Sequence, residues 1–141
     1  MGGLLAVAIT LILATAVGLW LQRSGRRLGR ARTKRVETRE VVDATELGAA
    51  LGERATLVQF STAFCQPCRA TRRVLDEVSS AVPGVVHVEV DAESNLDLVR
   101  RLDVRRTPTV LVLDAGGRVV RRASGQPRKA DVIAALGEAV A

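Results

Sequence analysis

The first 21 residues form an apolar run that differs from the rest of the chain. No charged side chain occurs between Met1 and Leu21. Because the run is apolar on every side and long enough to cross about 30 Å of hydrocarbon, it predicts a transmembrane helix over residues 1–21. Two alternatives stay open. One is a buried helix of a globular domain, and the other is a cleaved signal peptide with Ala14-Thr15-Ala16 as its cleavage site, although no positive side chain precedes the run.

A basic, polar segment follows this run. Residues 22–40 contain eight arginines and lysines against two glutamates, so most of the chain's net charge of +6 falls here. The composition predicts a juxtamembrane tether without packed structure, which contacts anionic lipid head groups rather than nucleic acid. Positive residues beside a span favour the cytoplasmic side. We therefore expect a single-pass protein of the cell membrane with its C-terminal domain in the cytoplasm, and the extracytoplasmic side is the alternative.

The hydrophobic pattern of residues 41–141 predicts one α/β domain of about 100 residues. Crossover helices between the first three strands indicate parallel pairing, and a closing hairpin is antiparallel. This order predicts a mixed central sheet with helices on both faces. The expected elements are a capped helix from Asp43 through Leu51, strand 55–61, helix 69–81, strand 85–91, helix 96–102, strands 109–114 and 118–124, and a helix from Pro127.

The only two cysteines, Cys65 and Cys68, stand between the strand at 55–61 and the following helix. A sulfur at a helix N-terminus is favoured as thiolate by unpaired backbone N–H groups and by the helix dipole. The second sulfur, one turn further on, can close a disulfide with the first. The pair therefore predicts dithiol redox chemistry. Two sulfurs alone fill only half of a tetrahedral metal site, and no motif for another cofactor is present, so we expect neither metal nor cofactor beyond the redox-active disulfide.

With this strand order, the C-x-x-C motif resembles the thioredoxin family over residues 41–141. Cys65 and Cys68 stand where the family has its attacking and resolving cysteines, and Thr107-Pro108 stands where it has a cis-proline beside the dithiol. Gly116-Gly117 and Gly125 match its hairpin turn and the loop before its last helix. The resemblance implies a thioredoxin-like fold and a thiol–disulfide oxidoreductase, a protein-disulfide reductase. In that reaction Cys65 attacks a substrate disulfide, and Cys68 resolves the mixed disulfide.

Substrate contacts and partners also follow from the resemblance. Phe64, Gln66 and Pro67 flank the cysteines, and the backbone of Thr107 beside Pro108 would pair with an extended substrate segment. The partners implied are protein disulfide substrates and an upstream dithiol reductant.

Several residues depart from the family's pattern. Gln66 replaces a glycine between the cysteines, and Gln59 stands where the family has a buried aspartate that serves the resolving cysteine. A neutral amide cannot act as that base, so Gln59 is a candidate only for a supporting part in proton handling beside the resolving cysteine. His87 stands where the family has a nearby lysine, so it is a candidate for proton handling near neutral pH, or else an ordinary strand histidine. Arginines at 69, 72 and 73 would favour the thiolate through their positive charge, or simply form a solvated helix face.

The sequence therefore favours a membrane-anchored thiol–disulfide oxidoreductase that acts on protein disulfides. Two readings remain as alternatives: a metal-binding module that uses both thiolates, and a redox-inert thioredoxin-fold module that binds a partner.

Overall fold

The computed structural model describes residue 9 and residues 11–17, 34–35 and 40–141. The N-terminal unit comprises residues 1–30, and in it Ile9 and residues 11–17 are helical. Most of the predicted transmembrane helix, at 1–8, 10 and 18–21, lies outside the described residues, as do 22–33 and 36–39 of the predicted tether. Within the described part of the chain, none of the helices has the length and apolar character that a bilayer crossing requires.

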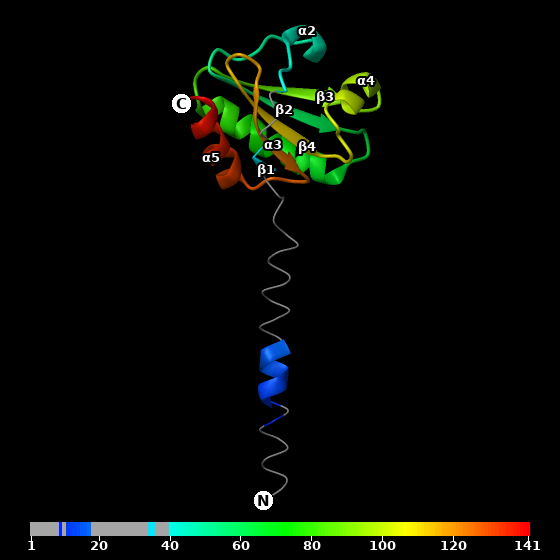
Figure 1. The fold of residues 1–141 in the computed structure, drawn as a ribbon, viewed down its shortest axis with the longest axis vertical. Coiled ribbons are helices and arrows are strands. Elements are labelled where there is room, and N and C mark those ends of the chain that lie inside the picture. The colour runs from blue at the N-terminus through cyan, green and yellow to red at the C-terminus, as the bar shows by residue number, and fades with distance from the viewer. Residues whose placement is uncertain (1–8, 10, 18–33, 36–39) are drawn as a thin grey trace, which may run out of the picture. The chain divides into compact units, whose positions relative to one another are not determined.

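The second unit contains the α/β domain, and Figure 1 shows its elements in chain order. The helices and strands are β1 (Lys34–Arg35), α2 (Ala44–Leu47), β2 (Ala55–Ser61), α3 (Gln66–Ala81), β3 (Val85–Asp91), α4 (Leu96–Arg101), β4 (Thr109–Asp114), β5 (Val119–Ser124) and α5 (Lys129–Ala139). The central mixed sheet has the strand order β1-β5-β4-β2-β3, so β3 is an edge strand. These elements confirm the thioredoxin-like α/β fold.

The direction of β4 corrects one prediction. β2 and β3 are parallel, as expected for a crossover through α3, but β4 is antiparallel to β2. The reason is the short second connection, since the six residues of α4 cover only about 9 Å. β4 therefore starts near the end of the sheet where β3 stops, and Thr109 pairs with Phe60 close to the carboxyl end of β2.

β1 also differs from the prediction. Lys34 and Arg35 pair antiparallel with Arg122 and Arg121 of β5, although they belong to the segment expected to be an unpacked tether. For these two residues that expectation is wrong. The backbone edge of β5 offers unpaired N–H and C=O groups that an extended chain of any composition can satisfy, so a polar sequence does not exclude pairing.

Helix boundaries follow from local chemistry. α2 has the expected capping box, in which the Asp43 side chain accepts from Glu46 N–H and the Glu46 carboxylate accepts from Asp43 N–H. The helix was predicted to run through Leu51, but it ends at Leu47 because Gly48 adopts the left-handed conformation and terminates it. α3 begins at Gln66, three residues before the predicted start, because Cys65 caps the helix and Pro67 stands in its first turn.

Two apolar layers hold the sheet. One lies between the sheet and helices α3 and α5, where Leu57, Leu75 and Val110 are fully or almost fully buried. The other lies on the face that α2 and α4 cover, around Phe60 and Leu102 (Figure 1). The α3 layer fixes the N-terminus of that helix against the carboxyl end of β2, and this contact positions the cysteines.

Candidate active site

The cysteines lie at the junction of β2 and α3. β2 is buried along its whole length and ends at Ser61, and a short turn follows in which Cys65 N–H donates to Thr62 O at 3.3 Å. Cys65 is the N-cap of α3, and Pro67 occupies the first turn, where a missing N–H leaves no helical hydrogen bond unmade. The strong strand and the capped helix therefore place Cys65 and Cys68 at one helix N-terminus.

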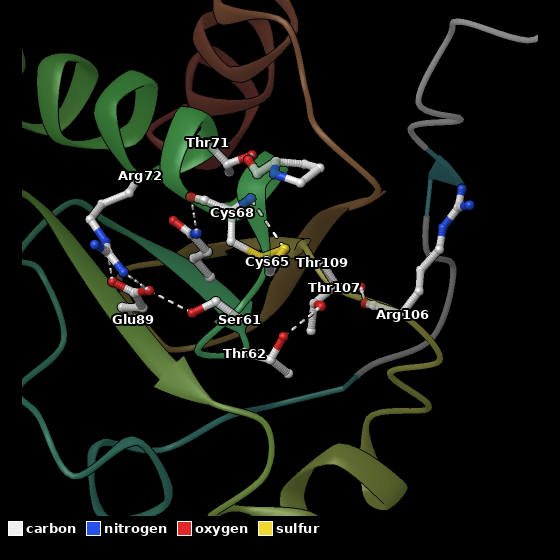
Figure 2. The surroundings of a disulfide bond; sticks show 12 residues. Ser61, Thr62, Cys65, Cys68, Thr71, Arg72, Glu89, Arg106, Thr107 and Thr109 are labelled. Atoms are coloured by element: carbon white, nitrogen blue, oxygen red, sulfur yellow. Dashed lines mark hydrogen bonds and ion pairs between the residues drawn. A yellow bond between two sulfur atoms is a disulfide. The ribbon is translucent and has the colours of Figure 1, made fainter.

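Cys65 and Cys68 form a disulfide with a Cα–Cα distance of 5.2 Å (Figure 2). Cys65 is partly exposed, whereas Cys68 is only 2% exposed. The backbone N–H of Cys68 donates to Cys65 Sγ at 3.2 Å. An N–H group of the first helical turn, which has no partner within the helix, therefore points at the sulfur of the more exposed cysteine. This asymmetry gives a substrate access to Cys65 and leaves Cys68 as the internal partner.

Gln59 lies below the first turn of α3. Its side chain is fully buried, and Nε2 donates to the backbone oxygen of Cys68 at 2.8 Å. Oε1 has no hydrogen-bond partner among the described residues. The amide therefore contacts the backbone of the resolving cysteine, and its predicted part in proton handling stays a prediction.

His87 lies away from the sulfurs. On β3 it pairs with Leu57, and its Nδ1 is 2.6 Å from Oδ1 of Asp76 on α3. The ring is 7% exposed, and Nε2 has no partner in the part of the chain that the structure describes. His87 does not line the cleft beside the disulfide, so the structure does not bring it together with Cys68. Its proton-handling role stays a prediction.

The peptide bond between Thr107 and Pro108 is cis, as expected. Oγ1 of Thr107 is 3.5 Å from Oγ1 of Thr62, which belongs to the turn before Cys65 (Figure 2). Pro108 is buried, and its carbonyl oxygen accepts from Gly125 N–H at 2.8 Å. These contacts join the β4 entrance to the cysteine turn.

The residues around the cysteines form an open surface. The Phe64 side chain is 99% exposed, and Gln66 and Pro67 are exposed as well. An exposed phenyl ring can bury apolar surface against a binding partner, which would stabilise a complex. Contact of these three residues with substrate stays a prediction.

A cleft of about 450 Å³ borders the disulfide on the side of β3. Within it, Arg72 donates from Nε and Nη2 to the two carboxylate oxygens of Glu89, each at 2.5 Å, and Ser61 Oγ donates to Glu89 Oε1 (Figure 2). Hydrogen bonding from Arg72 holds the pKa of Glu89 below its ordinary value, and the same bond raises the pKa of Arg72. The residues that line the cleft are Ser61, Thr62, Ala63, Cys65, Cys68, Arg69, Arg72, Glu89 and Asp91.

Sequence reasoning missed Glu89 and Ser61 as parts of this site. It named Arg72 only as a charge near the thiols, but Glu89 pairs with that charge. The sequence carried a signal for Glu89, because it stands two residues after His87 and therefore on the same face of the strand. The observed register places it opposite Gln59. Among the described residues, no group of three or more histidine, cysteine, aspartate or glutamate side chains is arranged to hold a metal ion.

Comparisons with known proteins agree with this geometry. A family model described as Thioredoxin matches residues 40–138. Thioredoxin from Alicyclobacillus acidocaldarius is 31% identical over 102 residues, which cover 72% of this chain and 96% of that protein. Thioredoxin H5 from Oryza sativa subsp. japonica is 35% identical over 60 residues, which cover 43% of this chain. The match spans only 44% of the rice protein's length.

A solved structure shows the same fold. Thioredoxin NaTrxh from Nicotiana alata superposes with a TM-score of 0.56 at 24% identity, over 63% of this chain and 76% of that chain.

Proposed function

Because the chain belongs to the thioredoxin family, we propose that it is a thiol–disulfide oxidoreductase that exchanges disulfides with protein substrates through Cys65 and Cys68. The observation that carries the proposal is the closed Cys65–Cys68 pair at the N-terminus of α3, with one sulfur accessible and the other buried.

The reaction uses this asymmetry. In the reduced protein, the Cys65 thiolate attacks a substrate disulfide, forms a mixed disulfide and releases one substrate thiol. Cys68 then attacks Cys65 Sγ, closes the protein disulfide and releases the second substrate thiol. The substrate gains two electrons and the protein loses two. The Cys68 N–H that donates to Cys65 Sγ favours a thiolate there, both as attacking group and as leaving group.

We propose the reductive direction, with an upstream dithiol as electron donor. Each turnover leaves the Cys65–Cys68 disulfide oxidised, and the chain has only these two cysteines. A further dithiol must therefore return the electrons. The proposed contacts with substrate are Phe64, Gln66 and Pro67, which flank the cysteines along the chain, and Thr107 and Pro108 at the entrance of β4.

The proposal includes membrane anchoring by residues 1–21, with the basic segment of residues 22–40 outside β1 as a tether and the redox domain on the cytoplasmic face. Its support is the absence of charged side chains from 1–21, the helical conformation at residues 9 and 11–17, and the arginine-rich sequence that follows. Labelling pre-reduced intact cells with a membrane-impermeant thiol reagent tests it, with lysed cells as control. Labelling only after lysis supports the cytoplasmic orientation, and labelling of intact cells contradicts it.

Trapping tests the activity itself. In Cys68→Ser the mixed disulfide cannot be resolved, so substrate proteins should accumulate on Cys65 as bands of higher mass on non-reducing gels. Treatment of the sample with dithiothreitol should remove these bands. Cys65→Ser is the matched control, because it keeps one cysteine at the same helix end and should trap far less. Equal behaviour of the two variants and the parent chain would favour a redox-inert module. Stoichiometric metal that either substitution removes would favour metal binding.

A further inference from the structure

Arg106 directly precedes the cis peptide bond at Thr107-Pro108, and β5 fixes its side chain. Nε donates to Ser124 Oγ at 2.9 Å, and Nη2 donates to Ser124 O at 3.4 Å. The guanidinium also lies against Gly125, because a Cβ at that glycine would be 3.7 Å from Nη2. On the backbone, Arg106 O accepts from Thr109 Oγ1 at 2.6 Å. An exposed arginine side chain is therefore held in one place at the entrance of β4.

The positive charge of Arg106 is not neutralised within the described part of the chain. Both of its side-chain hydrogen bonds go to uncharged oxygens of Ser124, and no described carboxylate forms an ion pair with it. Arg105, the preceding residue, differs, since its Nε is 2.9 Å from Asp103 Oδ1. Ser124 takes the N–H of Nε and one N–H of Nη2, so both N–H groups of Nη1 and the other of Nη2 remain to donate. Such a guanidinium edge matches a carboxylate, whose two oxygens accept parallel hydrogen bonds.

The position of Arg106 relative to the disulfide determines what it can contact. Thr107 Oγ1 is 3.5 Å from Thr62 Oγ1, and Thr62 O accepts from Cys65 N–H, so Thr107 adjoins the turn that carries the attacking cysteine. Figure 2 shows the Arg106 side chain extending beyond Thr107, away from the sulfurs, and Arg106 does not line the cleft beside them. A substrate segment that pairs with the Thr107 backbone would therefore pass Arg106 a few residues from its own cysteine, since an extended chain advances about 3.3 Å per residue.

We propose that Arg106 selects protein substrates that carry an acidic side chain, aspartate or glutamate, a few residues from the disulfide-bonded cysteine. The inference rests on the proposed oxidoreductase function and adds a substrate preference to it. The substrate carboxylate binds the free N–H groups of Arg106 while the substrate cysteine reacts with Cys65. Little side-chain ordering is needed on binding, because Ser124 and Gly125 already hold the guanidinium in place. A lysine at the same place in the substrate would meet a like charge and is disfavoured.

Synthetic peptide disulfides test the preference. Each peptide is an unstructured chain with a single cysteine, dimerised through that cysteine, and it carries glutamate, glutamine or lysine at about two to four residues from the cysteine, on its N-terminal or its C-terminal side. Pre-reduced, full-length protein is mixed with each dimer, and its oxidation is followed by acid quenching, thiol alkylation and mass spectrometry. The dimer is reduced to two peptide thiols while the protein dithiol loses two electrons and closes the Cys65–Cys68 disulfide. Each rate is divided by that of dithiothreitol with the same dimer, which removes differences in intrinsic reactivity.

The expected preference is that of an exposed charge pair with two-bond geometry. On at least one side of the cysteine, the normalised rate should be about fivefold higher with glutamate than with glutamine, and about fivefold lower with lysine than with glutamine. Equal normalised rates for the three side chains on both sides of the cysteine would overturn the inference. This comparison uses the parent protein alone, so its outcome does not depend on whether a variant folds.

Three variants locate the preference. Arg106→Gln should reduce the ratio of the glutamate rate to the glutamine rate to about one, and Arg106→Lys should keep part of that ratio, since lysine keeps the charge but lacks the forked donors. Arg105→Gln is the matched control, because it removes the same charge one residue away, from an arginine that Asp103 already neutralises. It should keep the ratio of the parent protein. An unchanged ratio in Arg106→Gln, or an equal loss in Arg105→Gln, would overturn the assignment to Arg106.

The glutamine dimers separate this inference from the function on which it rests. If they oxidise the protein and the charge of the neighbouring side chains does not change the normalised rate, this inference alone is overturned. If no dimer oxidises the protein and Cys68→Ser traps no substrate, both the inference and the proposed oxidoreductase function are overturned.

Discussion

The ion pair between Arg72 and Glu89 should stabilise the domain in a manner that depends on pH. It joins α3 to the edge strand β3, and the two bonds to the carboxylate are each 2.5 Å. We consider Arg72→Gln, Glu89→Gln and the double variant, because glutamine keeps the side-chain size and removes the charge. The quantity of interest is the coupling energy between the two positions in the free energy of unfolding.

The expected coupling is about 1 kcal/mol near neutral pH. Both side chains are partly in water, with 48% of Arg72 and 27% of Glu89 exposed, so solvent screens the attraction. Such pairs contribute about 0.2–1 kcal/mol, and the two-bond geometry places this one at the upper end. Because folding lowers the pKa of Glu89, this stability is present above the pKa of an unfolded glutamate, about 4.3, and is lost as the pH falls through the lower pKa of the folded protein.

Urea denaturation of the four oxidised proteins measures the coupling. The curves are recorded at neutral pH and at decreasing pH, as far as the parent protein remains folded. The coupling should diminish in acid, and also in high salt. A coupling indistinguishable from zero at neutral pH would refute the assigned ion pair. A coupling of equal size in acid would show that its origin is packing rather than charge.

Two further changes test the fold and the site. Gly117→Ala should lower the free energy of unfolding by about 2 kcal/mol or more, because Gly117 has φ +78° and a Cβ there would lie 2.2 Å from Val42 O. Its control, Gly137→Ala in α5, meets no atom within 4 Å and should stabilise by about 0.5–1 kcal/mol, as chemical denaturation will show. His87→Gln should change the rate of disulfide exchange by less than about twofold at each pH, because His87 contacts Asp76 outside the cleft. A displaced profile in stopped-flow kinetics would make His87 a proton carrier.

Local patterns predicted much of this molecule. β2 follows from a largely apolar run between turn signals, and the capping box of α2 follows from Asp43 and Glu46 at the required spacing. The position of the cysteines was also predictable locally, because the C-x-x-C motif stands between the end of a strand and the start of a helix. In each case the information lies within a few neighbouring residues.

Features that depend on distant parts of the chain were not predicted. The antiparallel direction of β4 depends on where the short connection through α4 ends, which is near the end of the sheet where β3 stops. The Arg72–Glu89 pair joins residues 17 positions apart, and its formation requires the register of α3 on the sheet. β1 is a backbone pairing, and side-chain pattern carries no signal for it. These features arise from tertiary packing, which a local pattern does not encode.

The edge position of β3 has a consequence for how copies of this domain meet. An edge strand presents unpaired backbone groups that can join to another sheet, and a flat apolar edge would promote aggregation. On β3, Glu89 and Asp91 are charged and exposed near the end that borders the cleft. Joining two such edges would bring Asp91 carboxylates together and strip water from the Arg72–Glu89 ion pair. The carboxylates that line the redox cleft thus also protect the domain against self-association.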